Sequence, residues 1–271
     1  MASAKDIIIK PIKASAANDL VKRIHYSGKV VNNSTLHFGA YLDGKLEGAM
    51  SFGSPLDKRK VLPLVSDTKW TGMLELNRMA FSDRLPRNSE SRCMAVAFRL
   101  IKKHYPHVEW ILSFSDGTQC GDGAIYRASG FVLTGIKKNT QIWQAPTGET
   151  FARMSLTDKT SQGQKLAAGK IISSVSVTKG KNMVGGASSM KQYIDAGFTP
   201  LIGYQLRYIY FLNKEAKQRL TVPIIPFSKI DEMGAGMYKG EKITRTKDQA
   251  LEFPSSLGGE TPTCALQTRA V

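Results

Sequence analysis

Three groups of side chains have residue types and a spacing that suit chemistry, and the first is an arginine-rich segment. Leu74–Phe81 is a predicted strand, a polar loop follows it, and a helix is predicted to begin at Ser89. A strand that leads into a helix N-terminus aims backbone N–H groups and the positive end of the helix dipole at one point, which suits a phosphate or pyrophosphate. Arg84, Arg87 and Arg92 add positive charge there. The simpler interpretation is a solvated basic loop.

The second group combines a carboxylate and a phenol. Asp116 follows a predicted buried strand, and Tyr126 comes ten positions later on a predicted short helix. Carboxylates at the carboxyl ends of strands in open α/β sheets face the ligand crevice. A tyrosine on the next helix can donate a proton or hold a leaving group. In the alternative interpretation, Asp116 caps a turn and Tyr126 packs on the sheet.

The third group is the pair His25-Tyr26 at the end of the first predicted helix. A histidine at this place can simply complement the helix dipole. Together with an aspartate, histidine and tyrosine can also relay protons or ligate iron. Two ligands adjacent in sequence do not decide between these roles. No base is identifiable for Cys120, which we interpret as structural.

The net charge of the chain indicates a polyanionic partner. The 271 residues include 38 Lys and Arg against 22 Asp and Glu, which gives a formal charge of +16. Each cation placed on a phosphate releases condensed counterions, so such an excess favours nucleic acid. A basic surface kept for solubility, or one that binds an anionic membrane, would give the same count.

The cysteines and the hydropathy indicate a soluble protein of a reducing cytoplasm. Cys93, Cys120 and Cys264 are odd in number and far apart, so they predict neither a disulfide framework nor a zinc site. The amino-terminal segment lacks the apolar stretch of a signal peptide. No segment approaches the roughly 20 apolar residues of a membrane span, so we expect no membrane partner.

Hydrophobic spacing and turn residues predict an α/β domain with a mixed sheet. Asp43-Gly44 suits a tight turn with positive φ, so the strands on either side of it are predicted to form a hairpin. The predicted elements are a strand over 6–12, a helix over 14–24, strands over 36–42, 45–52 and 72–81, a helix over 89–105, a strand over 109–115, a short helix ending near 129, and strands over 131–136 and 141–143.

The later part of the chain differs in composition. Residues 157–200 are rich in Gly, Ser, Lys and Ala and contain a short helical piece at 190–195. Residues 204–212 are rich in aromatic and β-branched side chains and predict a strong strand. We therefore expect a basic insertion over 157–200 before the last core strand. The Ser-, Gly- and Pro-rich residues 246–271 predict a disordered tail behind a single domain over 1–245.

Several stretches of the sequence resemble a known family. The order of the elements is similar to that of the GNAT acyltransferase superfamily, and the more specific resemblance is to the Mom family of phage adenine-modification proteins. The matching stretches are His25–Ser27, Glu75–Phe81, Leu85–Ser91, Phe114–Asp116, Gly123–Tyr126 and Tyr204–Tyr210. They follow one another in one order, which is more specific than any single motif. The resemblance implies a GNAT-like mixed sheet flanked by helices.

The resemblance also implies an activity, the addition of a carbamoylmethyl group to the exocyclic amine of adenine in DNA, which hides phage DNA from host restriction enzymes. By position, Arg78 and Ser91 look like acyl-CoA-site residues of the family. Arg87 and Asn88, in the loop that suits a phosphate, complete the expected cofactor site.

The same resemblance implies which residues act on the substrate. His25, Tyr26, Asp116 and Tyr126 look like active-site residues of the family. Acetyl-CoA and iron are associated with the family, and if Fe²⁺ binds, the implied ligands are His25, Tyr26 and Asp116.

The product raises a question about the donor that chemistry alone can pose. Acetyl transfer onto the adenine amine would give an amide joined through its carbonyl, whereas the family's product is joined through a methylene and ends in a primary amide. One route activates the acetyl methyl, which suits a redox metal. The other transfers a glycyl group, whose free amine then attacks ring carbon 6 and expels the amide. Acetyl-CoA and a glycyl donor therefore both stay open.

DNA as a substrate sets a further requirement. The adenine amine is paired inside the duplex, so we expect base flipping or action on exposed strands. Lys165, Lys170, Lys179 and Lys181 of the insertion are the candidates for contacts with the DNA backbone. Two alternatives remain, an ordinary N-acetyltransferase acting on a small amine or protein, and a DNA-binding protein without catalysis.

Overall fold

A computed structural model describes residues 3–25, 27–118, 121–157, 190–238 and 241–242. A seven-stranded mixed sheet forms its centre, and β4 and β5 are the parallel pair in that sheet. The strands across the sheet are β1 (Ile8–Pro11), β2 (Ser34–Leu42), β3 (Lys45–Gly53), β4 (Met73–Phe81), β5 (Trp110–Asp116), β10 (Gly203–Phe211) and β6 (Val132–Asn139). The predicted α/β class with a mixed sheet is confirmed.

The hairpin of β2 and β3 forms as the sequence predicts. Asp43 and Gly44 have φ values of 49° and 76°, which a tight turn between right-twisted strands requires. The register pairs Leu42 with Lys45 directly across the turn.

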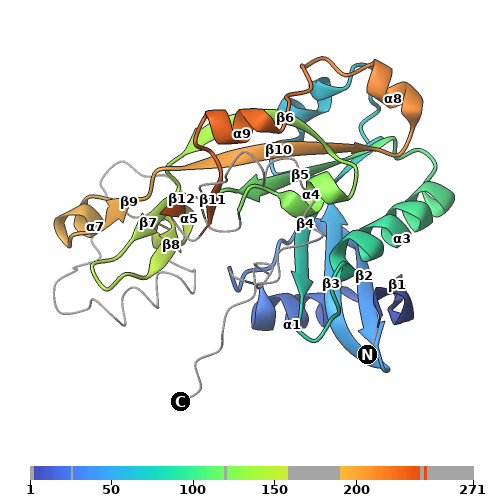
Figure 1. Cartoon of the computed structure of the whole chain (residues 1–271), viewed down its shortest axis with the longest axis horizontal. Coiled ribbons are helices and arrows are strands. Elements are labelled where there is room, and N and C mark those ends of the chain that lie inside the picture. The colour runs from blue at the N-terminus through green and yellow to red at the C-terminus, as the bar shows by residue number, and fades with distance from the viewer. Residues whose placement is uncertain (1–2, 26, 119–120, 158–189, 239–240, 243–271) are drawn as a thin grey trace.

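Two helices cover opposite faces of the sheet (Figure 1). Helix α1 (Ala14–Ile24) buries Ala17 and Leu20 against Ala49 of β3. Helix α3 (Ser89–His104) buries its apolar stripe against the other face, where Met50 lies. Successive strand residues point to opposite faces, so Ala49 and Met50 mark the two layers of the core. The α3 layer also contains Phe38, Phe52, Leu76, Cys93, Met94, Ala97, Phe98 and Ile101.

Strands β4 and β5 separate after a short parallel contact. Their pairing covers Met73–Glu75 against Trp110–Leu112 and then ends, while β4 continues along β3 and β5 along β10. Figure 1 shows the two halves of the sheet diverging from this point. Ser113, the next residue of β5, has a buried Oγ without a hydrogen-bond partner.

The remaining elements are short. A second sheet of β8 (Thr150–Ala152), β7 (Ile142–Gln144) and β9 (Thr199–Pro200) packs around its own aromatic cluster. The short helices are η1 (Ala4–Asp6), α2 (Lys58–Val61), η2 (Leu62–Leu64), α4 (Ala124–Ala128), α5 (Arg153–Thr157), α7 (Lys191–Asp195), α8 (Lys214–Gln218) and α9 (Ser228–Glu232), and a further strand pair is β11 (Met237–Tyr238) with β12 (Glu241–Lys242). Among the described helices, none is long and apolar enough to cross a membrane.

The strand predicted over 204–212 is confirmed as β10. Two other sequence-based predictions concern residues that lie largely outside the described ranges. Most of the predicted basic insertion, residues 158–189, and the predicted tail, 246–271, lie outside the described residues. The insertion and the single domain over 1–245 therefore stay predictions.

Candidate active site and cofactor hollow

A hollow of about 770 Å³ opens at the start of α3, and we call it the α3 hollow. Three residues predicted to bind a cofactor, Arg87, Asn88 and Ser91, line it together. The sequence folds this way because Pro86 interrupts the chain after β4 and Asn88 takes a left-handed conformation with φ of 67°. The full lining is Ser3, Ala4, Lys5, Pro86, Arg87, Asn88, Ser91, Arg92, Ala95, Phe98, Ala128, Ser129 and Tyr210.

The chemistry of this lining suits an anion attached to an apolar group. The first-turn N–H groups of a 16-residue helix lack intrahelical acceptors and carry positive partial charge. Arg87 and Lys5 add full charges. The rings of Phe98 and Tyr210 lie 4.4 Å apart and provide an apolar wall. These residues fit the pyrophosphate of a coenzyme A ester.

Arg92 has a different role from the one that its charge indicated. Its Nε donates to the Ala4 carbonyl at 2.7 Å, and its Nη2 donates to the Lys5 carbonyl at 3.2 Å. Arg92 therefore fastens the amino-terminal segment to α3, and this contact brings Lys5 to the hollow. Lys5 could not be predicted from local sequence, because its placement depends on a contact across more than 80 positions.

A second polar group lies on the α1 face of the sheet, and we call His25, Glu75, Asn77 and Arg78 the α1-end cluster. His25 follows the last turn of α1 and is only 8% exposed. Arg78 on β4 donates from Nε to the Lys29 carbonyl at 2.9 Å and from Nη1 to the Asn77 carbonyl at 2.7 Å. The positive charge of the Arg78 guanidinium lowers the pKa of both His25 and Glu75, so Arg78 lies close to both side chains.

His25 is a neutral ring held in one orientation. The backbone N–H of Ser27 donates to its Nδ1 at 3.2 Å, so the neutral ring carries its proton on Nε2. Burial, and then the positive charge of Arg78, lower the pKa of His25 from 6.5 to about 3. At neutral pH this side chain therefore acts as an N–H donor rather than as a base.

Glu75 is the residue of the cluster that sequence reasoning missed. Burial raises the pKa of Glu75 from 4.5 to about 7, and this effect exceeds the opposing effects of a hydrogen bond with Asn77 and of the charge of Arg78. Asn77 is itself held by the Ser34 hydroxyl, which donates to its Oδ1 at 3.0 Å. The sequence signal for Glu75 was a carboxylate between Leu74 and Leu76 in a largely apolar predicted strand.

The structure places Asp116 and Tyr126 in the contacts of the simpler interpretation. The Thr118 N–H donates to the Asp116 carboxylate at 3.0 Å across the turn after β5, and burial raises the pKa of that carboxyl group. The Tyr126 ring lies 5.2 Å from Phe131 and 5.3 Å from Tyr208. A catalytic role for either residue stays a prediction.

The implied iron ligands lie only partly within the described residues, so the iron site stays a prediction. Tyr26 lies outside the described ranges. Within those ranges, no three His, Cys, Asp or Glu side chains are grouped so that they could hold a metal ion. His25 also lies beside the positive charge of Arg78, which disfavours a divalent cation at this ring. Arg78 belongs to the α1-end cluster and is not among the residues that line the α3 hollow. Its role in cofactor binding therefore stays a prediction.

Solved structures similar to this chain are acyl-transferring enzymes. An N-acyl amino acid synthase from uncultured soil microbes is 12% identical, with 79% of this chain and 95% of that chain covered and a TM-score of 0.40. A GNAT family N-acetyltransferase from Escherichia coli in complex with CoA is 16% identical, with 46% and 68% covered and a TM-score of 0.34. TM-scores this low leave the fold class to rest on the sheet and helix layers described above.

The sequence comparisons define the family. The model of the Mom protein family matches residues 6–229. "Methylcarbamoylase mom" of Escherichia phage Mu is 32% identical over 222 residues, which is 82% of each chain. The chain belongs to the Mom protein family, and the predicted resemblance is confirmed.

Proposed function

We propose that this protein is an enzyme that converts adenine in DNA to its N6-carbamoylmethyl derivative and so protects phage DNA from restriction in the host cytoplasm. The observation that carries the proposal is the family match. It extends over residues 6–229, which include the α1-end cluster and most of the residues that line the α3 hollow, and the phage Mu relative is named a methylcarbamoylase.

The charge of the chain supports DNA as the substrate. A formal charge of +16 favours binding to a polyanion through counterion release. The amine that is modified is paired inside a duplex, so the base must leave the stack, at a cost of a few kcal/mol. A small-amine acetyltransferase would need neither property.

The two polar sites suit different parts of the reaction. Arg87, Asn88 and Ser91 in the α3 hollow would hold the phosphates of a donor such as acetyl-CoA, which supplies an activated acyl carbonyl when bound. Glu75, with a pKa of about 7, suits the removal of a proton from the attacking amine at neutral pH. The His25 Nε2–H and the Arg78 guanidinium suit stabilisation of the oxyanion that forms.

The connectivity of the product favours a glycyl donor over acetyl-CoA. In the first step the adenine amine bonds to the glycyl carbonyl carbon, the bond from that carbon to the donor oxygen or sulfur breaks, and the donor leaves as an alcohol or thiol. In the second step the glycyl amine attacks C6, the C6–N6 bond breaks, and N6 leaves as the nitrogen of the primary amide. Protons are only relocated, and no oxidant is needed. Acetyl transfer would require oxidation of a methyl group and a separate nitrogen source.

Mass spectrometry of nucleosides tests the proposal. DNA from a bacterium that expresses this chain is expected to contain deoxyadenosine heavier by one C2H3NO unit. Because cells also build the purine ring from glycine, the ¹⁵N content of the modified base is compared with that of unmodified deoxyadenosine from the same DNA. With ¹⁵N-glycine the modified base should carry one additional ¹⁵N, which remains after hydrolysis of the terminal amide because the glycine nitrogen is bonded to C6. Label from acetate in its place would establish the acetyl route. Unchanged deoxyadenosine from folded protein would favour an ordinary acetyltransferase or a non-catalytic DNA binder.

Asp116→Asn separates catalysis from binding. Asparagine keeps an oxygen that can accept from the Thr118 N–H, so the turn after β5 should persist. We expect loss of adenine modification with unchanged DNA affinity, measured by nucleoside analysis and by a binding titration. Normal modification by this variant would show that the predicted catalytic role of Asp116 is wrong.

A further inference from the structure

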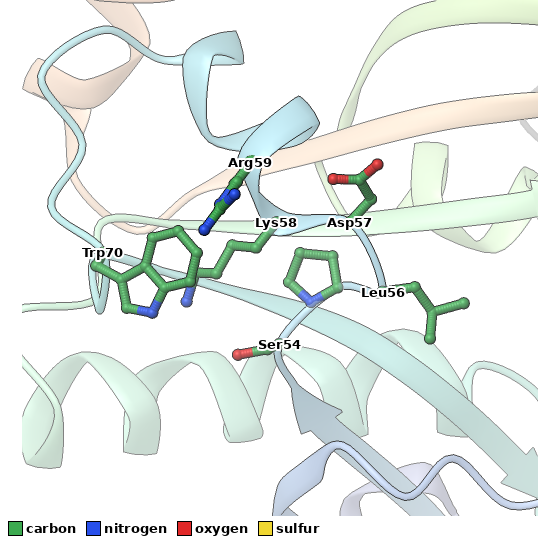
Figure 2. Close-up of a pocket in the computed structure, with 7 residues that line it drawn as sticks. Ser54, Leu56, Asp57, Lys58, Arg59 and Trp70 are labelled. Atoms are coloured by element: carbon green, nitrogen blue, oxygen red, sulfur yellow. The ribbon is translucent and has the colours of Figure 1, made fainter.

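The connection between β3 and β4 forms a second hollow, of about 360 Å³, which we call the Trp70 hollow (Figure 2). Its lining is Ser54, Pro55, Leu56, Asp57, Lys58, Arg59 and Trp70. Its volume lies within the range of about 300–1,000 Å³ that is typical of small-molecule sites. None of the residues predicted to act on the substrate or to bind the cofactor lies in this lining.

Lys58 is a buried cation without a carboxylate partner among the described residues. The residue is only 9% exposed, and its Nζ lies 5.0 Å from the centroid of the Trp70 ring. The neighbouring Asp57 pairs with Lys60 at 2.6 Å instead, and no ion pair of Lys58 occurs among the described residues. Burial lowers the pKa of Lys58. A buried positive charge without a counterion is unfavourable, so Lys58 would favour an anion bound at this site.

Trp70 provides an aromatic surface next to this cation. Its side chain is 56% exposed, and the neighbouring Leu56 is 87% exposed. In Figure 2, the Trp70 ring, the Lys58 stem and Arg59 lie around one opening. An exposed indole beside two cations has the composition of a site for nucleotides, in which bases stack on aromatic rings and phosphates contact Lys or Arg.

The position of the hollow relates it to the acceptor side of the enzyme. Ser54 directly follows Gly53, which pairs with Glu75 across β3 and β4. The Asn33 side chain donates to the Ser54 carbonyl, and the adjoining Ser34 holds Asn77 of the α1-end cluster. The α3 hollow, by contrast, begins beyond the other end of β4. The Trp70 hollow therefore adjoins the end of β4 that carries Glu75.

We propose that the Trp70 hollow binds one nucleotide of the DNA strand that carries the adenine, with its base on Trp70 and its phosphodiester at Lys58 and Arg59. This inference rests on the proposed function for the choice of DNA as the ligand. Stacking on Trp70 would hold a neighbouring base out of the helical stack and so keep the target strand open.

The test is the affinity of the full chain for a short single-stranded DNA that contains adenine, with RNA of the same sequence as competitor. Lys58→Met removes the charge and keeps the stem, and Trp70→Leu removes the aromatic ring. We expect each variant to bind DNA about tenfold more weakly, as the loss of one stacked base or one charged contact does. Lys60→Met, an exposed and ion-paired lysine on the same short helix, should stay within about twofold of the wild type.

The outcomes are distinguishable from those of the proposed function. Lys58→Met removes an uncompensated buried charge, so it should melt no earlier than the wild type, and weaker binding cannot then be attributed to unfolding. Wild-type affinity in both variants would overturn the inference, even if the chain modifies adenine. Tighter binding of the RNA would overturn the assignment to DNA. Weaker DNA binding by both variants would support the site, even if no modified adenine were found.

Discussion

At the scale of single residues, Glu75 determines how the reaction should depend on pH. A general base must be ionised to act, and burial holds the pKa of Glu75 at about 7. We expect the modification rate to rise as pH increases towards 7 and to level off above it. Glu75→Gln should lose this limb and about 100-fold or more of the rate, measured as modified adenine formed per time. Asp19→Asn, an exposed acid on α1, is the matched control, and a retained limb in Glu75→Gln would contradict the role.

The same side chain links stability to pH in the opposite direction from a salt-bridged acid. The folded-state pKa of Glu75 lies above the ordinary 4.5, so between these values the folded state binds more protons than the unfolded state. The free energy of unfolding should therefore fall as pH rises from about 4.5 to about 7. Glu75→Gln removes this loss, which is on the order of 3 kcal/mol for a shift of this size. Urea unfolding at pH 5 and pH 8 measures it, and identical pH slopes in the two proteins would refute it.

Residue chemistry was predictable from the sequence only where it followed local order. Arg87, Asn88 and Ser91 were recognised because a strand, a loop and a helix start follow one another directly, and the structure places the three in one hollow. Glu75 and Lys58 were not recognised, because burial of a charge is a tertiary property. Arg78 donates to a carbonyl in the loop after α1. The sequence of β4 alone could not predict this contact, because the loop is distant in the chain.

At the scale of elements, the long periodic segments were predictable and the short ones were not. Helix α1 and the β2–β3 hairpin have the predicted bounds to within two residues. The pieces α2, β8 and α9 contain three to five residues and have no periodicity of their own. Packing holds them instead, as Ile230 of α9 shows by its burial in the main core. The separation of β4 from β5 could not be predicted from the sequence either, because both strands have the pattern of ordinary apolar strands.

The start of α3 is the element on which donor binding should depend. Arg87→Ala removes one charge from the α3 hollow, and we expect about tenfold weaker binding of a coenzyme A ester by calorimetry, or about 1.4 kcal/mol. Arg99→Ala is the matched control, since Arg99 is exposed on the same helix and does not line the hollow. An equal loss of affinity in the two variants would mean that the net charge of α3, and not the hollow, attracts the ligand.

At the scale of the whole molecule, the charge of +16 and the Trp70 hollow would contribute to DNA binding in different ways. A diffuse positive surface attracts a polyanion from a distance and selects no position along it. A buried lysine beside an exposed tryptophan fixes a single nucleotide. With DNA as the proposed substrate, charge would provide fast capture, and the Trp70 hollow would then place one strand near the α1-end cluster.

This division predicts how DNA affinity should respond to salt. Affinity should fall linearly on a log–log scale against salt concentration, with a slope of about −0.9 for each phosphate contacted. We expect a slope steeper than about −3 for a short duplex, measured by fluorescence anisotropy from about 50 to 300 mM salt. Lys58→Met should make the slope shallower by about 1, whereas Lys103→Met, an exposed lysine near the end of α3, should leave it unchanged. A wild-type affinity that barely changes with salt would remove the electrostatic basis for DNA as the substrate, because the positive side chains would then not contact phosphates.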